Sequence, residues 1–176
     1  MRMITTIGRY GLAAGLIVGS ILFGTTVGFH RNIPDPMVGM GIGYAGMLLA
    51  FSMIVIAIRR HRDGVLGGVI GFGPALGLGL GITLVATIFY VLAWEAALAV
   101  TGMDFGAEYA GFMIAEAQKS GDAAAIDRAR AEAAQFARDY AQAWWRMAVT
   151  ATEILPVGVL VSLVAAGWLS RRGARP

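Results

Sequence analysis

Hydrophobic positions gather in four long stretches that carry almost no charge. They cover 10–29, 37–58, 64–94 and 147–170, and the last contains one acid, Glu153. A membrane-crossing helix needs about 20 apolar residues, so each stretch is long enough to cross a bilayer. The pattern predicts an all-α integral membrane protein with one membrane domain and four transmembrane helices, at about 8–29, 37–58, 74–100 and 147–169.

The third stretch is too long for one upright helix. Its first part, 64–73, contains five glycines. Pro74 then suits the first turn of a helix, where its missing N–H costs nothing. We therefore predict an interfacial loop over 64–73 and a helix from Pro74 onward. The pattern leaves one alternative, a short re-entrant segment, whose irregular backbone must be shielded by protein or face a water-filled cavity.

Composition narrows the class of protein. Of the 176 residues, 57% are hydrophobic and only 14% are charged, against about 25% charged in an ordinary soluble domain. Glycine occurs 25 times and cysteine is absent. These values exclude a disordered chain, a disulfide scaffold and an ordinary cytosolic enzyme.

Much of the glycine recurs every four residues inside the predicted spans. In lipid, small residues at this spacing let helix backbones approach closely. We expect these ladders to be helix-packing surfaces. They are Gly11, Gly15 and Gly19; Ser20, Gly24 and Gly28; Gly39 and Gly43; and Gly73, Gly77 and Gly81.

Basic residues predict the orientation. Eight of them, with Asp63 as the only acid, lie at the N-terminus, after the second span and at the C-terminus, whereas 101–146 has five basic residues and seven acids. In the turn over 30–36, the charges of Arg31 and Asp35 cancel. Because lysine and arginine stay on the cytoplasmic side, we expect both termini in the cytoplasm and 101–146 outside, which in a bacterium is the periplasm. The first apolar core is longer than that of a signal peptide, so we interpret it as a retained helix.

The segment 101–146 has a helical pattern of its own. Apolar residues recur in two series that are broken at Ser120-Gly121-Asp122, where Asp122 is a good helix N-cap. The pattern predicts an extracytoplasmic helical hairpin. Its first arm is expected to continue the third span, and its second arm is expected to lead into the fourth. The series are Phe105, Tyr109 and Phe112, then Ile126, Ala129, Ala133, Phe136, Tyr140 and Ala143.

Two interpretations of this hairpin remain open. It is either a solvated spacer between two spans or a docking surface, over 105–143, for a protein partner or a second copy of the chain. Long loops with their own secondary structure tend to be functional, which favours docking. Tryptophan is enriched at membrane interfaces, so four residues are predicted interface anchors: Trp94, Trp144, Trp145 and Trp168.

Two acids lie inside the apolar spans. Charged residues there are costly and usually face the bundle interior. Helical spacing puts Glu95 on the face of Gly77 and Gly81. Beside Glu153, Pro156 cannot donate to the carbonyl of Thr152. Glu95, Glu153, Thr152 and Pro156 are therefore a candidate intramembrane polar site for a cation or a proton. The alternatives are purely structural hydrogen bonds, or catalysis.

The remaining motifs indicate little chemistry. Arg59, Arg60 and Arg62 form a basic cluster that sets topology and is a candidate contact for anionic lipid. The string Gly41-x-Gly43-x-x-Gly46 resembles a dinucleotide fingerprint but lies in a predicted span without a preceding strand. We find no catalytic triad or set of metal ligands, and expect no catalytic residues, metal, cofactor or nucleic-acid partner.

Several short motifs, spread over most of the chain, are shared with a known family. They are Gly43-Tyr44-x-x-Met47-Leu48-x-Ala50-Phe51, Ile58-x-x-x-Arg62-Asp63, Gly67-Gly68-x-Ile70-x-Phe72-Gly73, Tyr90-Val91-x-x-Trp94-Glu95 and Glu153-Ile154-x-Pro156-Val157-Gly158. With these motifs the chain resembles the bacterial family of uncharacterised membrane proteins known as domain of unknown function 4199. The resemblance implies a four-helix membrane protein of bacteria, located in the inner membrane, and no activity. In place of the Tyr-x-Asn-Pro that relatives often have before the last span, Tyr140 is followed here by no proline, so the outer arm is expected to run unbroken into the fourth span.

From the sequence we expect a non-enzymatic interaction, assembly or scaffold protein that acts through its hairpin. The alternative is a small transporter or channel-like subunit that moves a proton or cation with Glu95 and Glu153. Four helices are few for a transporter, so that alternative favours an oligomer.

Overall fold

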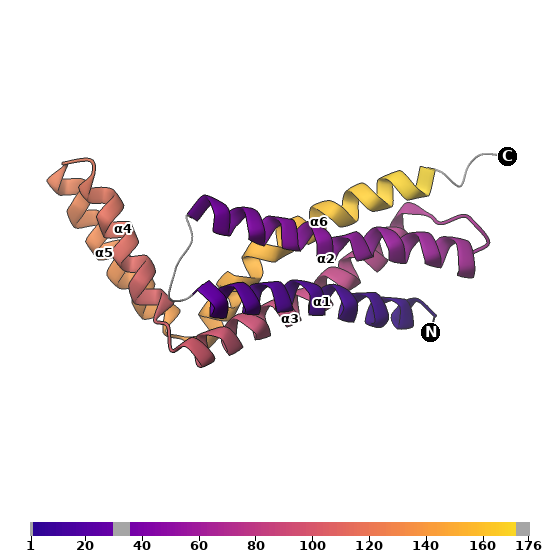
Figure 1. Cartoon of the computed structure of the whole chain (residues 1–176). Helices are drawn as coiled ribbons and strands as arrows, with labels where there is room; N and C mark the ends of the chain where they lie inside the picture. The colour runs from indigo at the N-terminus through magenta and orange to yellow at the C-terminus, as the bar shows by residue number, and fades with distance from the viewer. Residues whose placement is uncertain (1, 30–35, 172–176) are drawn as a thin grey trace. The chain divides into compact units, whose positions relative to one another are not determined.

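The computed structural model describes residues 2–29 and 36–171 (Figure 1). Arg31, Asp35, Arg172 and Arg175, which entered the prediction of orientation, lie outside the described residues. The described residues form an all-helical fold, as predicted. Its six helices are α1 (Arg2–Phe29), α2 (Pro36–Val65), α3 (Phe72–Thr101), α4 (Phe105–Gln118), α5 (Ala123–Tyr140) and α6 (Ala143–Arg171).

Four of the described helices are long and apolar enough to cross a membrane, and they indicate a membrane protein. The qualifying segments are Arg2–Phe29, Met37–Val65, Phe72–Thr101 and Ala143–Ser170. All four are longer than the segments expected from hydropathy, because residues at the ends of the spans continue the helices.

The chain divides into two compact units, each described here by itself. The first, which we call the bundle, covers Met1–Ala97 and Thr150–Pro176, and the second, the hairpin unit, covers Leu98–Val149. The bundle holds α1, α2, most of α3 and most of α6, which run alongside one another (Figure 1). Its core consists of large side chains from three helices, all 0% exposed: Phe51, Ile54 and Ile58 of α2, Leu78 and Ile82 of α3, and Ile154 and Leu169 of α6.

Several glycines of the bundle are sites of close helix contact. A Cβ added at Gly11 would lie 2.7 Å from Val85, and one at Gly15 would lie 2.7 Å from Phe89. One face of α1 therefore packs directly on α3, as its glycine ladder predicts. On α3, Gly81 approaches Ile7 of α1 in the same way, at 2.7 Å.

Other glycines of the predicted ladders have no such contact with the described residues. A Cβ added at Gly24, Gly28, Gly39, Gly43 or Gly73 would meet nothing within 4 Å. Spacing alone does not reveal which glycines face a neighbouring helix, because that depends on the rotation of each helix in the bundle. Conversely, Gly79 and Gly158, which belong to no predicted ladder, lie at the tightest crossing described below.

The connection between α2 and α3 is shorter than the predicted loop. Helix α2 continues to Val65, and α3 already begins at Phe72, with Pro74 in its first turn. Between them, Gly67 and Gly68 adopt positive φ values of 71° and 101°, which glycine tolerates without strain. The side chain of Ile70 is 2% exposed and belongs to the core, so this connection packs on the bundle.

The outer surface of the bundle is rich in large apolar side chains. They come from all four of its helices and include Leu12 and Leu16 of α1, Leu48 and Leu49 of α2, Leu84, Ile88 and Leu92 of α3, and Leu160 and Val164 of α6. A monomeric protein in water rarely exposes an apolar area that surrounds a whole bundle. This surface suits contact with lipid chains.

The hairpin unit contains α4 and α5, which are separated from the long helices by short breaks. Helix α3 ends at Thr101, Gly102 follows with a φ of 67°, and Asp104 caps α4 by accepting from the backbone N–H of Ala107 at 3.0 Å. The expectation that one arm continues the third span was therefore wrong. The C-terminal arm is not continuous either, since α5 ends at Tyr140 and α6 begins at Ala143. Asp122 caps α5 as predicted, accepting from Ala124 N at 2.9 Å.

Candidate functional site

The clearest polar contact inside the bundle joins α3 to α6. The Tyr90 hydroxyl donates a hydrogen bond of 3.1 Å to the carboxylate of Glu153. Tyr90 is only 6% exposed, whereas Glu153 lies on the exposed side of α6. The buried phenol therefore holds the carboxylate against the bundle. Hydrogen bonds between helices in lipid contribute about 0.6–2 kcal/mol, enough to favour one register of α3 against α6.

The other residues of the candidate polar site on α6, Thr152 and Pro156, lie close to Glu153 along the helix. Pro156 lies inside α6, which continues past it to Arg171. Thr152 and Pro156 are exposed like Glu153, whereas Thr150, one turn before, is 4% exposed. The α6 part of the candidate site is therefore an outward-facing surface with one buried hydroxyl behind it.

Glu95 lies on another side of α3 from the contact with Glu153. At 3.6 residues per turn, five residues separate Glu95 from Tyr90 by about 140° around the helix. Tyr90 shares the α6-facing side of α3 with Gly79, which approaches Ser162. The structure pairs Glu153 with Tyr90, and helical spacing separates Glu95 from Tyr90 around α3.

A second polar contact between α3 and α6 was missed in the sequence. The hydroxyls of Thr83 and Ser162 lie 3.3 Å apart in the core. Each also donates to a carbonyl one turn earlier in its own helix, Thr83 to Gly79 at 3.0 Å and Ser162 to Gly158 at 2.7 Å. The sequence signal is a repeated pattern, a glycine followed four residues later by a hydroxyl.

The two glycines of that pattern make a reciprocal crossing. A Cβ added at Gly79 would lie 2.7 Å from Ser162, and one at Gly158 would collide with Thr83. Each helix thus inserts its hydroxyl-bearing residue against the glycine of the other. We call Gly79, Thr83, Gly158 and Ser162 the glycine–hydroxyl crossing.

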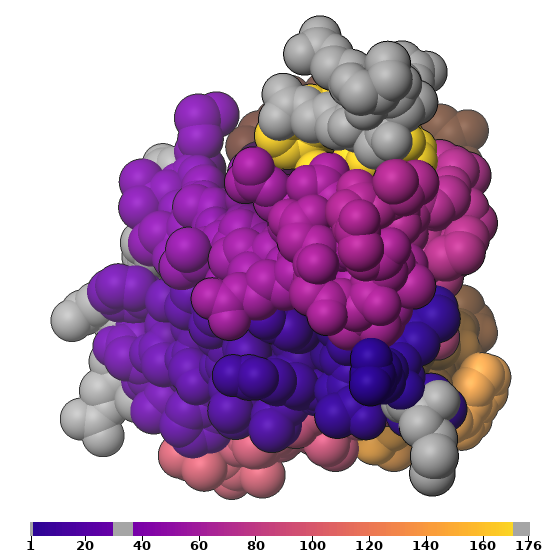
Figure 2. Space-filling model, turned by 90° about the vertical axis from the view of Figure 1, so that its right-hand side faces the viewer, coloured from indigo at the N-terminus to yellow at the C-terminus, as the bar shows by residue number. Residues whose placement is uncertain are grey.

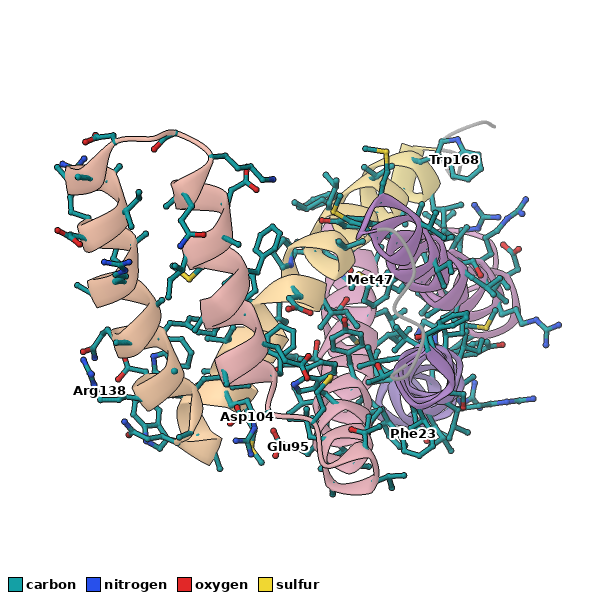
Figure 3. All side chains as sticks on the ribbon, turned by 60° about the vertical axis from the view of Figure 1, so that its left-hand side comes forward. Phe23, Met47, Glu95, Asp104, Arg138 and Trp168 are labelled. Carbon is teal, nitrogen blue, oxygen red and sulfur yellow. The ribbon has the colours of Figure 1, made fainter. Side chains whose placement is uncertain are left out.

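Aromatic rings hold α4 and α5 together in the hairpin unit. Tyr140 is 5% exposed, and its ring centroid lies 5.2 Å from that of Phe105, 5.4 Å from that of Phe136 and 6.2 Å from that of Trp145. The guanidinium of Arg146 lies over the Tyr140 ring at 5.9 Å and donates to the Tyr140 carbonyl at 3.2 Å. Polar side chains such as Arg138 point away from α4 (Figure 3).

The predicted apolar series of α4 lies on one side of the helix, as its spacing indicates, but its exposure differs along the helix. Phe105 packs on Tyr140, and Tyr109, although 42% exposed, packs on Phe136 with ring centroids 4.9 Å apart, whereas Phe112 is 56% exposed. The rings of Tyr109 and Phe112 contact each other, with centroids 6.1 Å apart. On α5, Ala133, Phe136 and Tyr140 face inward as the spacing indicates. We call Tyr109 and Phe112 the exposed aromatic pair.

The four predicted tryptophan anchors lie in different surroundings. Trp144 is 67% exposed and Trp168 is 45% exposed, at opposite ends of α6, and Figure 3 shows Trp168 projecting outward. Trp94 is half-buried on α3. Trp145 instead packs edge-on against Phe136, with centroids 5.6 Å apart, so it belongs to the aromatic cluster of the hairpin unit.

The predicted basic cluster separates into different environments. Arg62 donates to Asp63 at 2.6 Å, so its charge is already paired. Arg59 and Arg60 are exposed, and His61 between Arg60 and Arg62 is 7% exposed. Within residues 2–29 and 36–171, no group of three or more histidine, aspartate or glutamate side chains is placed to hold a metal ion.

Comparison with known proteins gives a family and nothing more specific. The profile of the family described as protein of unknown function DUF4199 matches residues 9–171. No curated protein and no solved structure matches the chain. The resemblance seen in the sequence motifs is thereby confirmed.

Proposed function

The chain belongs to the DUF4199 family, whose function is unknown, and we propose that it is a membrane-anchored interaction protein that docks a partner through its α4–α5 pair. The observation that carries the proposal is the exposed aromatic pair, Phe112 at 56% exposure and Tyr109 at 42%, at the edge of the ring cluster that holds α4 to α5. A mere spacer has no need of exposed rings on a separately packed unit.

The location of this unit is part of the proposal. We propose a bacterial inner-membrane protein with both termini in the cytoplasm and α4–α5 on the outer side. The charge distribution supports this orientation, because the excess of arginine lies at the opposite ends of the spans. The occupant is then an extracytoplasmic protein or a second copy of the chain.

The geometry of the surface resembles a small protein-binding site. Binding energy in interfaces concentrates in a few aromatic or arginine side chains surrounded by weaker contacts. Around the exposed aromatic pair, Glu108, Gly111 and Ala115 are also exposed. These small and acidic neighbours leave the rings accessible, so the pair is the expected energetic centre of the interface.

We predict that Phe112→Ser removes docking without unfolding α4–α5. Because Phe112 is 56% exposed, its loss costs little stability, whereas loss of a central aromatic weakens an interface by about 2 kcal/mol or more, roughly thirty-fold. A photo-reactive amino acid at the exposed position Ala115 measures docking by cross-link yield in native membranes. A product of twice the chain mass identifies a second copy, and any other product identifies a different partner.

The control is the same photo-reactive residue at Arg128, which is exposed on α5. Docking through α4 predicts a strong cross-link from position 115, a weak one from 128, and loss of the first with Phe112→Ser. Equal cross-linking with and without that substitution, or none from position 115, contradicts the proposal.

Proton or cation handling by Glu95 and Glu153 receives less support. A shared site for a proton or cation needs both carboxylates to converge, whereas Tyr90 is the hydrogen-bond partner of Glu153 and Glu95 lies about 140° from Tyr90 around α3. The contact between Tyr90 and Glu153 is sufficient as a structural link between helices. We therefore propose no transport activity.

A further inference from the structure

A cavity opens where the start of α1 meets the end of α2. Its volume is about 410 Å³. Figure 2 views this end of the bundle, with the first turns of α1 in indigo directly beside the end of α2 in magenta. The lining residues are Arg2, Thr5, Thr6, Arg9 and Tyr10 of α1, and Arg60, His61 and Val65 of α2.

The charge of this cavity is positive and unbalanced. Three of the lining residues are arginines and none is acidic. The ion pairs Arg62–Asp63, Lys119–Glu116 and Arg130–Asp127 of the described residues involve no arginine of the cavity. The guanidiniums that line the cavity are thus available to an anion from outside the bundle.

Hydrogen bonds fix the walls of the cavity. The Thr6 hydroxyl donates its hydrogen to the Arg2 carbonyl at 2.9 Å, and its oxygen lies 3.2 Å from Nδ1 of His61. Because a hydroxyl has one hydrogen, Nδ1 of His61 is the donor in the second contact. This contact links α1 to α2 through a side chain that is 7% exposed. Arg9 is held in turn over the Tyr10 ring at 5.9 Å.

The size and chemistry of the cavity define a class of ligand. Small-molecule sites typically occupy about 300–1,000 Å³, so the cavity can hold more than a single ion. Guanidinium groups bind phosphate oxygens through paired hydrogen bonds, and arginine suits this geometry better than lysine. The cavity also lies at the ends of two candidate spans, the level at which lipid headgroups lie.

We propose that this cavity is a binding site for a phosphate-bearing anion, in which Arg2, Arg9 and Arg60 contact the phosphate and His61 with Thr6 keeps the two helices in place. The phosphate comes either from the headgroup of an anionic phospholipid or from a soluble phosphate ester. Both sources present the same chemistry to the arginines, and the experiment below separates them.

The test uses the full chain in neutral detergent, with bound lipid measured by native mass spectrometry against phosphatidylglycerol or zwitterionic phosphatidylcholine. We expect preferential retention of phosphatidylglycerol or, for a soluble ligand, binding of glycerol phosphate without lipid. Removing one basic residue near an anionic lipid weakens binding about five-fold, so Arg60→Gln is expected to have that effect and Arg9→Gln with Arg60→Gln about 25-fold.

Arg59→Gln is the matched control, because Arg59 is the exposed neighbour of Arg60 and does not line the cavity. It changes the net charge equally and is expected to leave binding unchanged. Displacement of phosphatidylglycerol by glycerol phosphate assigns a soluble source, and retention in its presence assigns a lipid source. Equal weakening by Arg59→Gln and Arg60→Gln overturns the proposal, as does wild-type protein that neither prefers phosphatidylglycerol nor binds glycerol phosphate.

Discussion

Gly158→Val is expected to destabilise the bundle more than any other conservative substitution within a predicted span. The first added carbon collides with Thr83 and lies 2.8 Å from the Phe51 ring, which is itself fully buried. Overpacking of a tight core costs about 1–3 kcal/mol, and this site belongs at the upper end because two neighbours from different helices must move. For a chain of this size, about 3 kcal/mol lowers Tm by roughly 6–12 °C.

Gly167→Val provides the comparison on the same helix. An added Cβ at Gly167 meets nothing within 4 Å, so this substitution is expected to change stability by less than about 0.5 kcal/mol. Thermal unfolding in detergent, followed by circular dichroism, measures both variants. Equal melting of Gly158→Val and wild type contradicts the reciprocal crossing, as does an equal loss in Gly167→Val.

Tyr140→Ala is the second substitution with a large expected effect, and its effect is confined to the hairpin unit. The ring is 5% exposed and contacts Phe105, Phe136 and Trp145, so its removal leaves a cavity where α4 meets α5. Truncation of a buried aromatic costs about 3–5 kcal/mol. We therefore expect α4 and α5 to open far more often.

Limited trypsin digestion measures this opening, because α5 contains Arg128, Arg130 and Arg138. When opening is fast relative to cleavage, the cleavage rate follows the population of the open form. A cost of about 3–5 kcal/mol is therefore expected to accelerate cleavage of Tyr140→Ala by roughly two to three orders of magnitude. Phe112→Ala is the control, since its ring is 56% exposed and its loss leaves the packing intact. If Phe112→Ala is cleaved as fast as Tyr140→Ala, the aromatic cluster is not what holds α4 to α5.

The sequence predicted those parts of the fold that depend on local signals. Long apolar stretches mark spans by length alone, and the aspartate after Ser120-Gly121 marks the start of a helix because its carboxylate satisfies an end N–H group. The same logic applies to Thr101-Gly102-Met103-Asp104, where glycine permits positive φ and Asp104 caps the next helix. That signal was present and was missed, which is why a continuous arm was expected.

The polar sites were harder to predict because they depend on how each helix is rotated. Glu95 and Glu153 are the two acids inside the predicted spans, but Tyr90 and Glu95 lie about 140° apart around α3, and it is Tyr90 that donates to Glu153. Likewise, Gly158 is critical because Thr83 faces it from a helix far away in sequence. Sequence spacing finds residues on one face of a helix, whereas the partner of that face is a tertiary property.

The proposed orientation puts the turn between α4 and α5 on the outer side of the membrane and the connection after α2 in the cytoplasm. The chain has no cysteine, so a single introduced cysteine is the only thiol in it that a maleimide can label. Suitable exposed positions are Ser120, between α4 and α5, and Leu66, just after α2. We predict that a membrane-impermeant maleimide labels Ser120→Cys in intact spheroplasts and labels Leu66→Cys only after permeabilisation. Labelling of both positions before permeabilisation, or of Leu66→Cys alone, contradicts this topology.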